Sequence, residues 1–139
     1  MAAPYRLAFL GGAYDSAVGR THRAAIELDQ RFELVCGCFS RHPDANRDTA
    51  RKYGIDPDRA HPDLDSLIDH ERAQIDALVI LTPTDRHTPQ IVRCIEAGLP
   101  VISEKALVGT VGDALTVRDA LRSHQGWLAV TYNYTGYPM

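Results

Sequence analysis

Short apolar runs alternate with segments of helical hydrophobic periodicity along the whole chain. The clearest run, Ile75–Leu81, is almost entirely apolar, which is typical of a strand covered on both faces. The expected strands are Tyr5–Leu10, Glu33–Phe39, Arg59–His61, Ile75–Leu81, Pro100–Ser103 and Trp127–Tyr132. The expected helices are Val18–Asp29, Pro43–Tyr53, Asp63–Ile68, Pro89–Ala97 and Gly112–His124. This alternation predicts an α/β fold with a doubly wound, mostly parallel sheet. In the first helix, Val18, Ala25 and Leu28 lie at core-facing spacing.

The chain has 139 residues, the size of one domain, and its 45% hydrophobic residues can build one core. A net charge of −3 with interspersed signs lacks the basic face that binds nucleic acid. No apolar run reaches the length of about 18 residues that a membrane helix needs. Three cysteines form no disulfide framework, which favours a reducing compartment. We expect a cytoplasmic protein that binds neither nucleic acid nor a membrane.

The first strand ends in a glycine turn that leads into a helix. Loops of this kind let the backbone approach the pyrophosphate of a dinucleotide, at the N-terminus of the following helix. Gly11 and Gly12 begin the turn, but the spacing G-x-G-x-x-G falls on Gly11, Ala13 and Ser16. Asp15 adds a carboxylate, whose repulsion of a phosphate about 4 Å away costs ~1 kcal/mol in water. The alternative is a plain turn in which Asp15 or Ser16 caps the helix.

The end of the second strand distinguishes the two nicotinamide dinucleotides. An acidic residue there binds the ribose hydroxyls of NAD, whereas a cation accommodates the 2′-phosphate of NADP. The chain has Ser40 and Arg41 at this point, and no acid before Asp44. The pattern favours NADP over NAD, and the alternative is a solvated arginine at a strand end.

Polar side chains also follow the later strands, whose carboxyl ends border the same crevice. Thr82 and Pro83 stop the most apolar strand, and His87 falls on the first turn of the next helix. Asn133 follows the last strand and is placed to point its amide at a cofactor or substrate. Histidines in a first helical turn also serve as caps or surface residues, so the position of His87 at a strand end is what favours a functional role.

Glu104 and Lys105 leave a buried strand directly into the crevice. Oxidation of an alcohol requires a hydride acceptor and a group that removes the hydroxyl proton. A partly desolvated lysine can do the second task because burial lowers the pKa of its amine. Only two of the fifteen basic residues are lysines, so a lysine at this position favours a role in proton transfer. The alternative is an exposed ion pair after a strand.

Four of these segments resemble motifs of the glucose–fructose oxidoreductase, inositol dehydrogenase and related (Gfo/Idh/MocA) family, in the same order. "LGGAYDSAVGRTHR" is similar to its longer glycine loop with the G-x-x-H-R that follows, and "CFSR" to its second-strand ending. "LTPTDRH" is similar to its T-P-N-x-x-H and "SEKA" to its E-K-P. Thr84 replaces the asparagine, Ala106 replaces the proline, and Ala13 and Asp15 replace loop glycines.

The resemblance implies a Rossmann-type NAD(P)-binding domain of an oxidoreductase that acts on a sugar or polyol. It implies that Lys105 lies beside the nicotinamide and takes part in catalysis, with Glu104 orienting it. The cofactor-binding candidates are Gly11, Gly12, Ala13, Asp15, Ser16, Val18, Ser40, Arg41, Thr82, Pro83, His87, Glu104, Lys105 and Asn133. We expect no metal ligands, because no cysteine or histidine pairs stand at zinc spacing.

The family also has a second domain, which binds the substrate and forms the oligomer. We expect residues 1–139 to be the dinucleotide-binding domain alone, with that C-terminal domain absent from this chain. A surface that the second domain covers then lies exposed, which favours self-association into a homo-oligomer. Two other functions stay open: a stand-alone nucleotide-binding module without catalysis, and an interaction domain that kept the fold and lost the ligand.

Overall fold

The computed structural model describes residues 3–136. Its strands form one five-stranded parallel sheet in the order β2-β1-β3-β4-β5. Its strands are β1 (Tyr5–Gly11), β2 (Phe32–Cys38), β3 (Ala77–Leu81), β4 (Val101–Glu104) and β5 (Leu128–Thr131). Its α-helices are α1 (Ala17–Asp29), α2 (Pro43–Lys52), α3 (Leu64–Glu71), α4 (His87–Glu96) and α5 (Val111–His124). Short 3-10 helices span Pro57–Arg59, Thr84–Arg86 and Asn133–Gly136. No helix within residues 3–136 combines the length and apolar character needed to cross a membrane.

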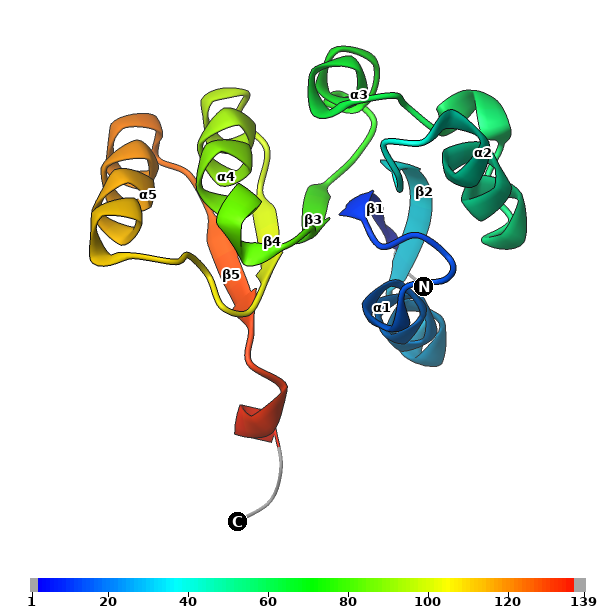
Figure 1. Cartoon of the computed structure of the whole chain (residues 1–139), viewed down its shortest axis with the longest axis horizontal. Helices are drawn as coiled ribbons and strands as arrows, with labels where there is room; N and C mark the ends of the chain where they lie inside the picture. The colour runs from blue at the N-terminus through cyan, green and yellow to red at the C-terminus, as the bar shows by residue number, and fades with distance from the viewer. Residues whose placement is uncertain (1–2, 137–139) are drawn as a thin grey trace.

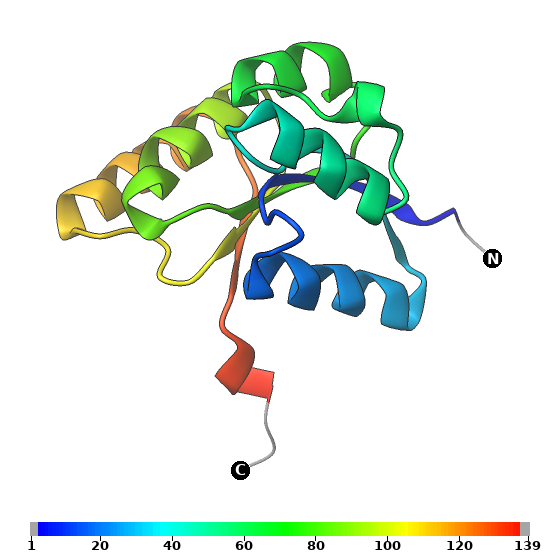
Figure 2. The ribbon, with the colours of Figure 1, turned by 45° about the vertical axis from the view of Figure 1, so that its right-hand side comes forward.

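The helices are divided unequally between the two faces of the sheet. The chain moves from β1 to β2 in one direction and then crosses back over β1 to β3, β4 and β5. Because parallel crossovers are right-handed, the reversal places α1 on one face and α3, α4 and α5 on the other. Figures 1 and 2 show α1 beneath the sheet, α3, α4 and α5 above it, and α2 beside the β2 edge. The expected doubly wound parallel sheet is confirmed.

Each face of the sheet carries its own apolar cluster. Leu78, Ile80 and Val101 pack against α4 and α5, where Ile91 and Val117 are buried. On the opposite face, the buried side chains belong to Leu7, Phe9, Ile26, Leu34, Phe39, Ala50, Tyr53, Ile55, Ala77, Val79 and Leu81. β3 is buried at every position, which explains its continuous apolar sequence.

Most of the expected elements form within one or two residues of their predicted bounds. The strand expected at Arg59–His61 is wrong, because the structure has a 3-10 helix over Pro57–Arg59 and a single bridge between Gly37 and Ala60. Pro57 fixes a backbone angle that suits the first turn of a helix, so this short segment cannot extend the sheet. α4 begins at His87 instead of Pro89, since proline is tolerated in the first helical turn.

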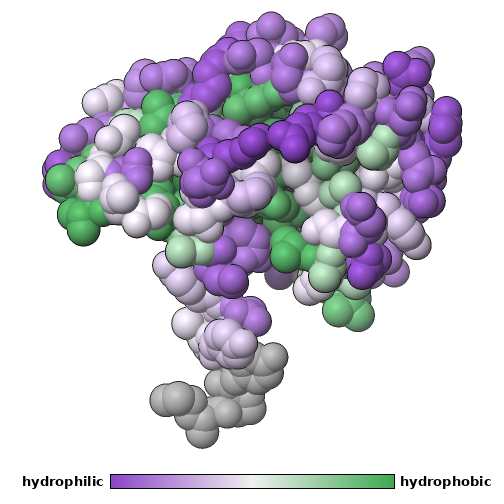
Figure 3. Space-filling model, viewed as in Figure 1, coloured by the Kyte–Doolittle hydropathy of each residue, from purple (hydrophilic) through white to green (hydrophobic). Residues whose placement is uncertain are grey.

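The prediction that Val18, Ala25 and Leu28 form the core-facing side of α1 is also wrong. Leu28 is 85% exposed, Val18 is 40% exposed and Ala25 is exposed, whereas Ile26 is buried. Ile26 is the α1 residue that joins the apolar cluster on this face of the sheet, so the other three side chains turn outward. Figure 3 shows hydrophobic residues in the hollow between β5 and α1.

Candidate active site

The glycine loop after β1 is close-packed against the start of α1. Gly11 and Gly12 have φ angles of 85° and 72°, a region that other residues rarely adopt. A Cβ on Gly19 would lie 2.3 Å from the carbonyl oxygen of Gly12, so only glycine fits there. The Tyr53 hydroxyl donates to the same Gly12 oxygen at 3.0 Å and fixes the loop from α2. The loop therefore has the close backbone packing that a pyrophosphate cradle requires.

Ser16, and not Asp15, caps α1. The Ser16 hydroxyl accepts a hydrogen bond from the Gly19 amide at 3.3 Å, and the first turn holds no acidic residue. Asp15 is exposed and lines neither of the two cavities described below. The partial positive charge at the start of α1 is therefore available to an anion.

One cavity, here called the loop cavity, has a volume of about 420 Å³ and lies at the ends of β1, β2 and β3. Ligand pockets commonly have volumes of about 300 to 1,000 Å³. Eight of the sequence-predicted cofactor residues line it: Gly11, Gly12, Ala13, Ser16, Ser40, Arg41, Thr82 and Pro83. The fold thus gathers most of the predicted dinucleotide residues around one hollow.

A buried asparagine shapes the loop cavity beside β2. Asn46 is 3% exposed, and its side-chain oxygen accepts hydrogen bonds from the amides of Phe39 at 2.8 Å and Ser40 at 3.2 Å. Its amide nitrogen donates to the carbonyl oxygen of His61 at 2.8 Å. Our sequence reasoning missed Asn46, although a polar residue on the inner face of a predicted helix was a usable signal.

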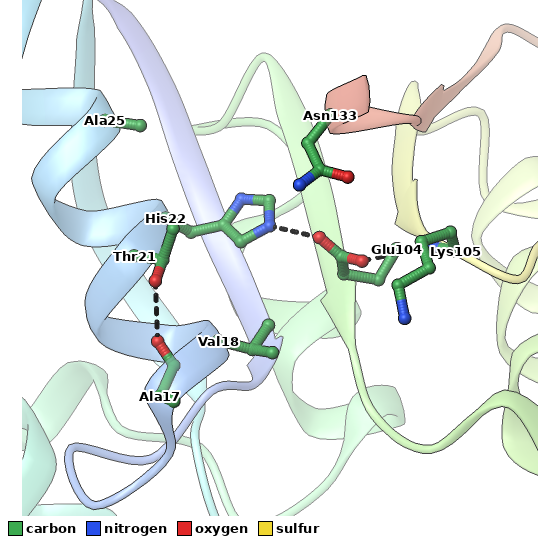
Figure 4. Close-up of a pocket in the computed structure, with 8 residues that line it drawn as sticks. All are labelled: Ala17, Val18, Thr21, His22, Ala25, Glu104, Lys105 and Asn133. Carbon is green, nitrogen blue, oxygen red and sulfur yellow. Dashed lines mark hydrogen bonds and ion pairs between the residues drawn. The ribbon is translucent and has the colours of Figure 1, made fainter. Parts of the chain in front are cut away.

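The second cavity, here called the lysine cavity, lies between α1 and the ends of β4 and β5 (Figure 4). It has a volume of about 350 Å³ and is lined by Ala17, Val18, Thr21, His22, Ala25, Glu104, Lys105 and Asn133. It brings together the remaining predicted residues except Asp15 and His87. The two cavities lie next to each other along the chain at the start of α1, since Ser16 lines one and the next residue, Ala17, lines the other.

Three hydrogen bonds hold the Glu104 carboxylate at the lysine cavity. His22 Nε2 lies 2.7 Å from Glu104 Oε1, the Thr131 hydroxyl donates to the same oxygen at 2.9 Å, and the Lys105 amide donates to Oε2 at 3.0 Å. Burial raises the pKa of Glu104, but these donors outweigh it and hold the pKa below its ordinary value. The sequence predicted that His22 lies mid-helix and packs under the glycine loop, and it predicted no role for Thr131. Only their placement in the fold shows these contacts.

The side-chain nitrogen of Lys105 has no hydrogen bond or ion pair with any residue between positions 3 and 136, and the residue borders the cavity. The peptide bond between Lys105 and Ala106 is cis. An amine in this position is free to meet a group that enters the lysine cavity.

His87 lies inside the protein and not on the crevice wall. Its side chain is fully buried, with Nε2 2.7 Å from the Thr82 carbonyl oxygen and Nδ1 about 3.0 Å from that of Ala106. The expectation that His87 contacts a cofactor is therefore corrected. Its ring instead ties the end of β3 to the segment that follows Lys105.

The comparison with known families agrees with this geometry. Residues 6–132 match the sequence profile of the Gfo/Idh/MocA group, described as "Oxidoreductase family, NAD-binding Rossmann fold". The chain belongs to this family. It is a Gfo/Idh/MocA NAD-binding domain, as the four motifs indicated.

Two relatives and one solved structure illustrate the similarity. The uncharacterized oxidoreductase YfiI of Bacillus subtilis is 29% identical over 98% of this chain and 36% of its own length. A 4-carboxy-2-hydroxymuconate-6-semialdehyde dehydrogenase of Sphingobium is 30% identical over 81% of this chain and 33% of its own length. An inositol dehydrogenase homologue of Azotobacter vinelandii, solved with NADH and myo-inositol, is 35% identical with a TM-score of 0.89. It matches over 98% of this chain and 37% of its own chain, so this Gfo/Idh/MocA domain spans about a third of the length of these relatives.

Proposed function

We propose that this Gfo/Idh/MocA domain binds the cofactor and supplies the catalytic lysine of an oxidoreductase that acts on a sugar or polyol. The observation that carries the proposal is that the neighbouring residues Ser16 and Ala17, at the start of α1, line the loop cavity and the lysine cavity respectively. The loop cavity has the glycine cradle, and the lysine cavity is lined by Lys105 and by the Glu104 carboxylate, which three hydrogen bonds hold. The glycine loop and the start of α1 would hold the phosphates of a dinucleotide, and Lys105 and Glu104 would lie at its nicotinamide end.

The residues of the lysine cavity fit the proton transfer of alcohol oxidation. When bound, the nicotinamide supplies the hydride acceptor. Lys105 takes the proton of the substrate hydroxyl, and a lysine amine is suited to this task because it can exchange a proton, unlike an arginine. Glu104 fixes the backbone at Lys105 through its bond to the amide, which keeps the lysine at the cavity. Asn133 lies at the same cavity and is placed to bind the substrate or the nicotinamide amide.

The substrate class is proposed from one relative. The inositol dehydrogenase homologue of Azotobacter vinelandii was solved with myo-inositol, a polyol, and NADH. We propose that polypeptide outside the domain 1–139 completes the substrate pocket, because the relatives are about three times as long. A cytoplasmic location and self-association stay predictions from the sequence.

For the cofactor, we propose that the domain binds both dinucleotides and prefers NADPH. Ser40, Arg41 and Arg47 line a hollow next to the loop cavity, at the end of β2. The two guanidinium groups suit a 2′-phosphate, and no acidic side chain lines this hollow. The NADH in the Azotobacter homologue supports binding of the unphosphorylated form.

The test is calorimetric titration of the chain with NADPH and NADH, together with the variant Arg41→Gln. We expect saturable binding of both and tighter binding of NADPH. In Arg41→Gln the affinity for NADPH should fall about tenfold or more, since a hydrogen bond to a charged group contributes ~1.5 to 3 kcal/mol. The affinity for NADH should change less than about twofold.

Arg51→Gln is the matched control, because Arg51 is an exposed arginine of α2 that does not line the hollow. It should leave both affinities unchanged. Absence of binding at millimolar cofactor would contradict the proposed function, and equal affinities in wild type and Arg41→Gln would contradict only the NADP preference.

A further inference from the structure

One hydrogen bond joins the two halves of the proposed cofactor path. His22 on α1 and Glu104 at the end of β4 are 82 positions apart, and their side chains point toward each other in Figure 4. His22 Nε2 lies 2.7 Å from Glu104 Oε1, and each side chain is 18% exposed. The His22 ring is also held edge-on against Phe9 of β1, with ring centres 6.3 Å apart.

The chemistry of this contact fixes which group donates. An ionised carboxylate can only accept hydrogen bonds, so His22 Nε2 must carry the proton. Glu104 Oε1 also accepts from Thr131 on β5, and Oε2 accepts from the Lys105 amide. The carboxylate therefore accepts hydrogen bonds from α1, from β5 and from the backbone amide of the next residue. Of these donors, His22 is the one that comes from the helix next to the glycine loop.

The contact links the glycine loop to Lys105 through short and rigid steps. α1 is fixed to the loop at Gly19, whose Cα has no space for a side chain against Gly12. His22 follows one turn later on the same helix, holds Glu104, and Glu104 holds the Lys105 backbone. Loss of the His22 donor would free one side of the carboxylate next to Lys105.

We propose that His22 is a positioning residue for the nicotinamide end of the cofactor, acting through Glu104 on the backbone of Lys105. The role rests on the proposed function, since it requires the nicotinamide to occupy the lysine cavity. His22 does not bind the phosphates or the adenosine, because it lines only the lysine cavity. Its effect is therefore confined to ligands that carry the nicotinamide ring.

The first part of the test needs no ligand. The pKa of the Glu104 carboxyl is measured by NMR titration in the wild type and in His22→Leu, His22→Gln and Thr131→Val. We expect the pKa to rise in His22→Leu and in Thr131→Val, because each loses a donor while the burial remains. His22→Gln keeps an N–H donor and should restore a value near that of the wild type. An unchanged Glu104 pKa in both donor-deleted variants would overturn the inference.

The second part compares NADH with ADP-ribose, which lacks the nicotinamide ring, by calorimetry on the same proteins. We expect His22→Leu to weaken NADH binding about tenfold, to leave ADP-ribose within about twofold, and His22→Gln to recover most of the loss. Arg23→Gln is the matched control, because Arg23 is the next residue on α1, pairs with Glu27 and does not line the lysine cavity. It should change neither affinity.

The outcomes separate this role from the proposed function. Equal weakening of NADH and ADP-ribose in His22→Leu would show a merely structural role and overturn the inference, while leaving cofactor binding intact. Unchanged binding of both ligands would also overturn it. A wild-type chain that binds neither ligand would overturn the proposed function itself, and the positioning role with it.

Discussion

At the scale of single residues, the glycines of the cofactor loop are specified by contact and not by flexibility alone. Gly19 lies inside α1, where its backbone angles are ordinary, yet a Cβ there would meet the Gly12 backbone at 2.3 Å. Gly112 in α5 offers the opposite case, since a Cβ would have only the Thr110 hydroxyl nearby, at 3.7 Å. Glycine is therefore required by close packing at Gly19, whereas a side chain would fit at Gly112.

This contrast gives a prediction for Gly19→Ala and Gly112→Ala. Gly19→Ala should destabilise the domain by about 2 kcal/mol, because overpacking costs ~1 to 3 kcal/mol, and it should abolish dinucleotide binding. Gly112→Ala should stabilise the domain by up to ~1 kcal/mol, because alanine is the better helix former. Urea unfolding and calorimetry measure the two effects. A Gly19→Ala protein of wild-type stability and affinity would show that α1 need not approach the loop closely.

At the scale of elements, a buried carboxylate anchors the segment between α2 and α3 beside the loop cavity. Glu71 at the end of α3 is buried, accepts from Arg59 Nε at 3.0 Å, and lies 3.0 Å from His61 Nε2. The hydrogen bonds from Arg59 are the largest influence on the pKa of Glu71 and hold it below its ordinary value, despite burial and with help from His61. The segment that they fix runs into Pro62 and Asp63, which line the loop cavity.

Glu71→Gln should therefore cost stability in a pH-dependent way. A depressed folded-state pKa contributes stability above the ordinary value of 4.5, and the contribution is lost as the pH falls through the folded value. We expect a loss of about 2 kcal/mol at pH 7, and a smaller difference from wild type as the pH falls below 4.5. Asp65→Asn, which removes an exposed pair with Arg93, should cost less than ~1 kcal/mol. Urea unfolding at several pH values checks this, and a pH-independent loss would contradict it.

At the scale of the whole molecule, the proposed cofactor path crosses the carboxyl edge of the sheet from β2 to β5. Its two halves are joined through β1, β3 and the contact between α1 and β4. A cofactor that binds only to the folded chain, and that contacts both halves of this path, would stabilise the two halves together. Cofactor binding should therefore raise the free energy of unfolding of the whole domain, and should not merely order one loop.

We predict that NADPH at 100 times its dissociation constant raises the free energy of unfolding by about 2.7 kcal/mol. For a domain of this size the midpoint of thermal unfolding should rise by roughly 10 °C. Differential scanning calorimetry at increasing NADPH concentration measures the shift. A midpoint that stays constant would contradict specific binding to the folded state.

Local patterns in the sequence were sufficient for the sheet and for much of the loop cavity. Apolar runs and turn residues predicted the five strands, and the rule that ligands bind at strand ends identified Gly11, Ser40 and Lys105 as neighbours of a crevice. These features are readable because each depends on residues close together in the chain. The failed strand at Arg59–His61 shows the limit, since its one bridge to Gly37 depends on how α2 and α3 pack.

The tertiary structure alone decided which polar side chains meet. It buried His87 between carbonyl groups, left Leu28 exposed on α1, and brought His22 to Glu104 across 82 positions. The physical reason is that helical and strand periodicity depends on near neighbours, whereas a hydrogen bond between α1 and β4 depends on the path of every element between them. The sequence by itself determined the fold class and the strand ends, and only the folded chain decided the hydrogen-bond partners at the site.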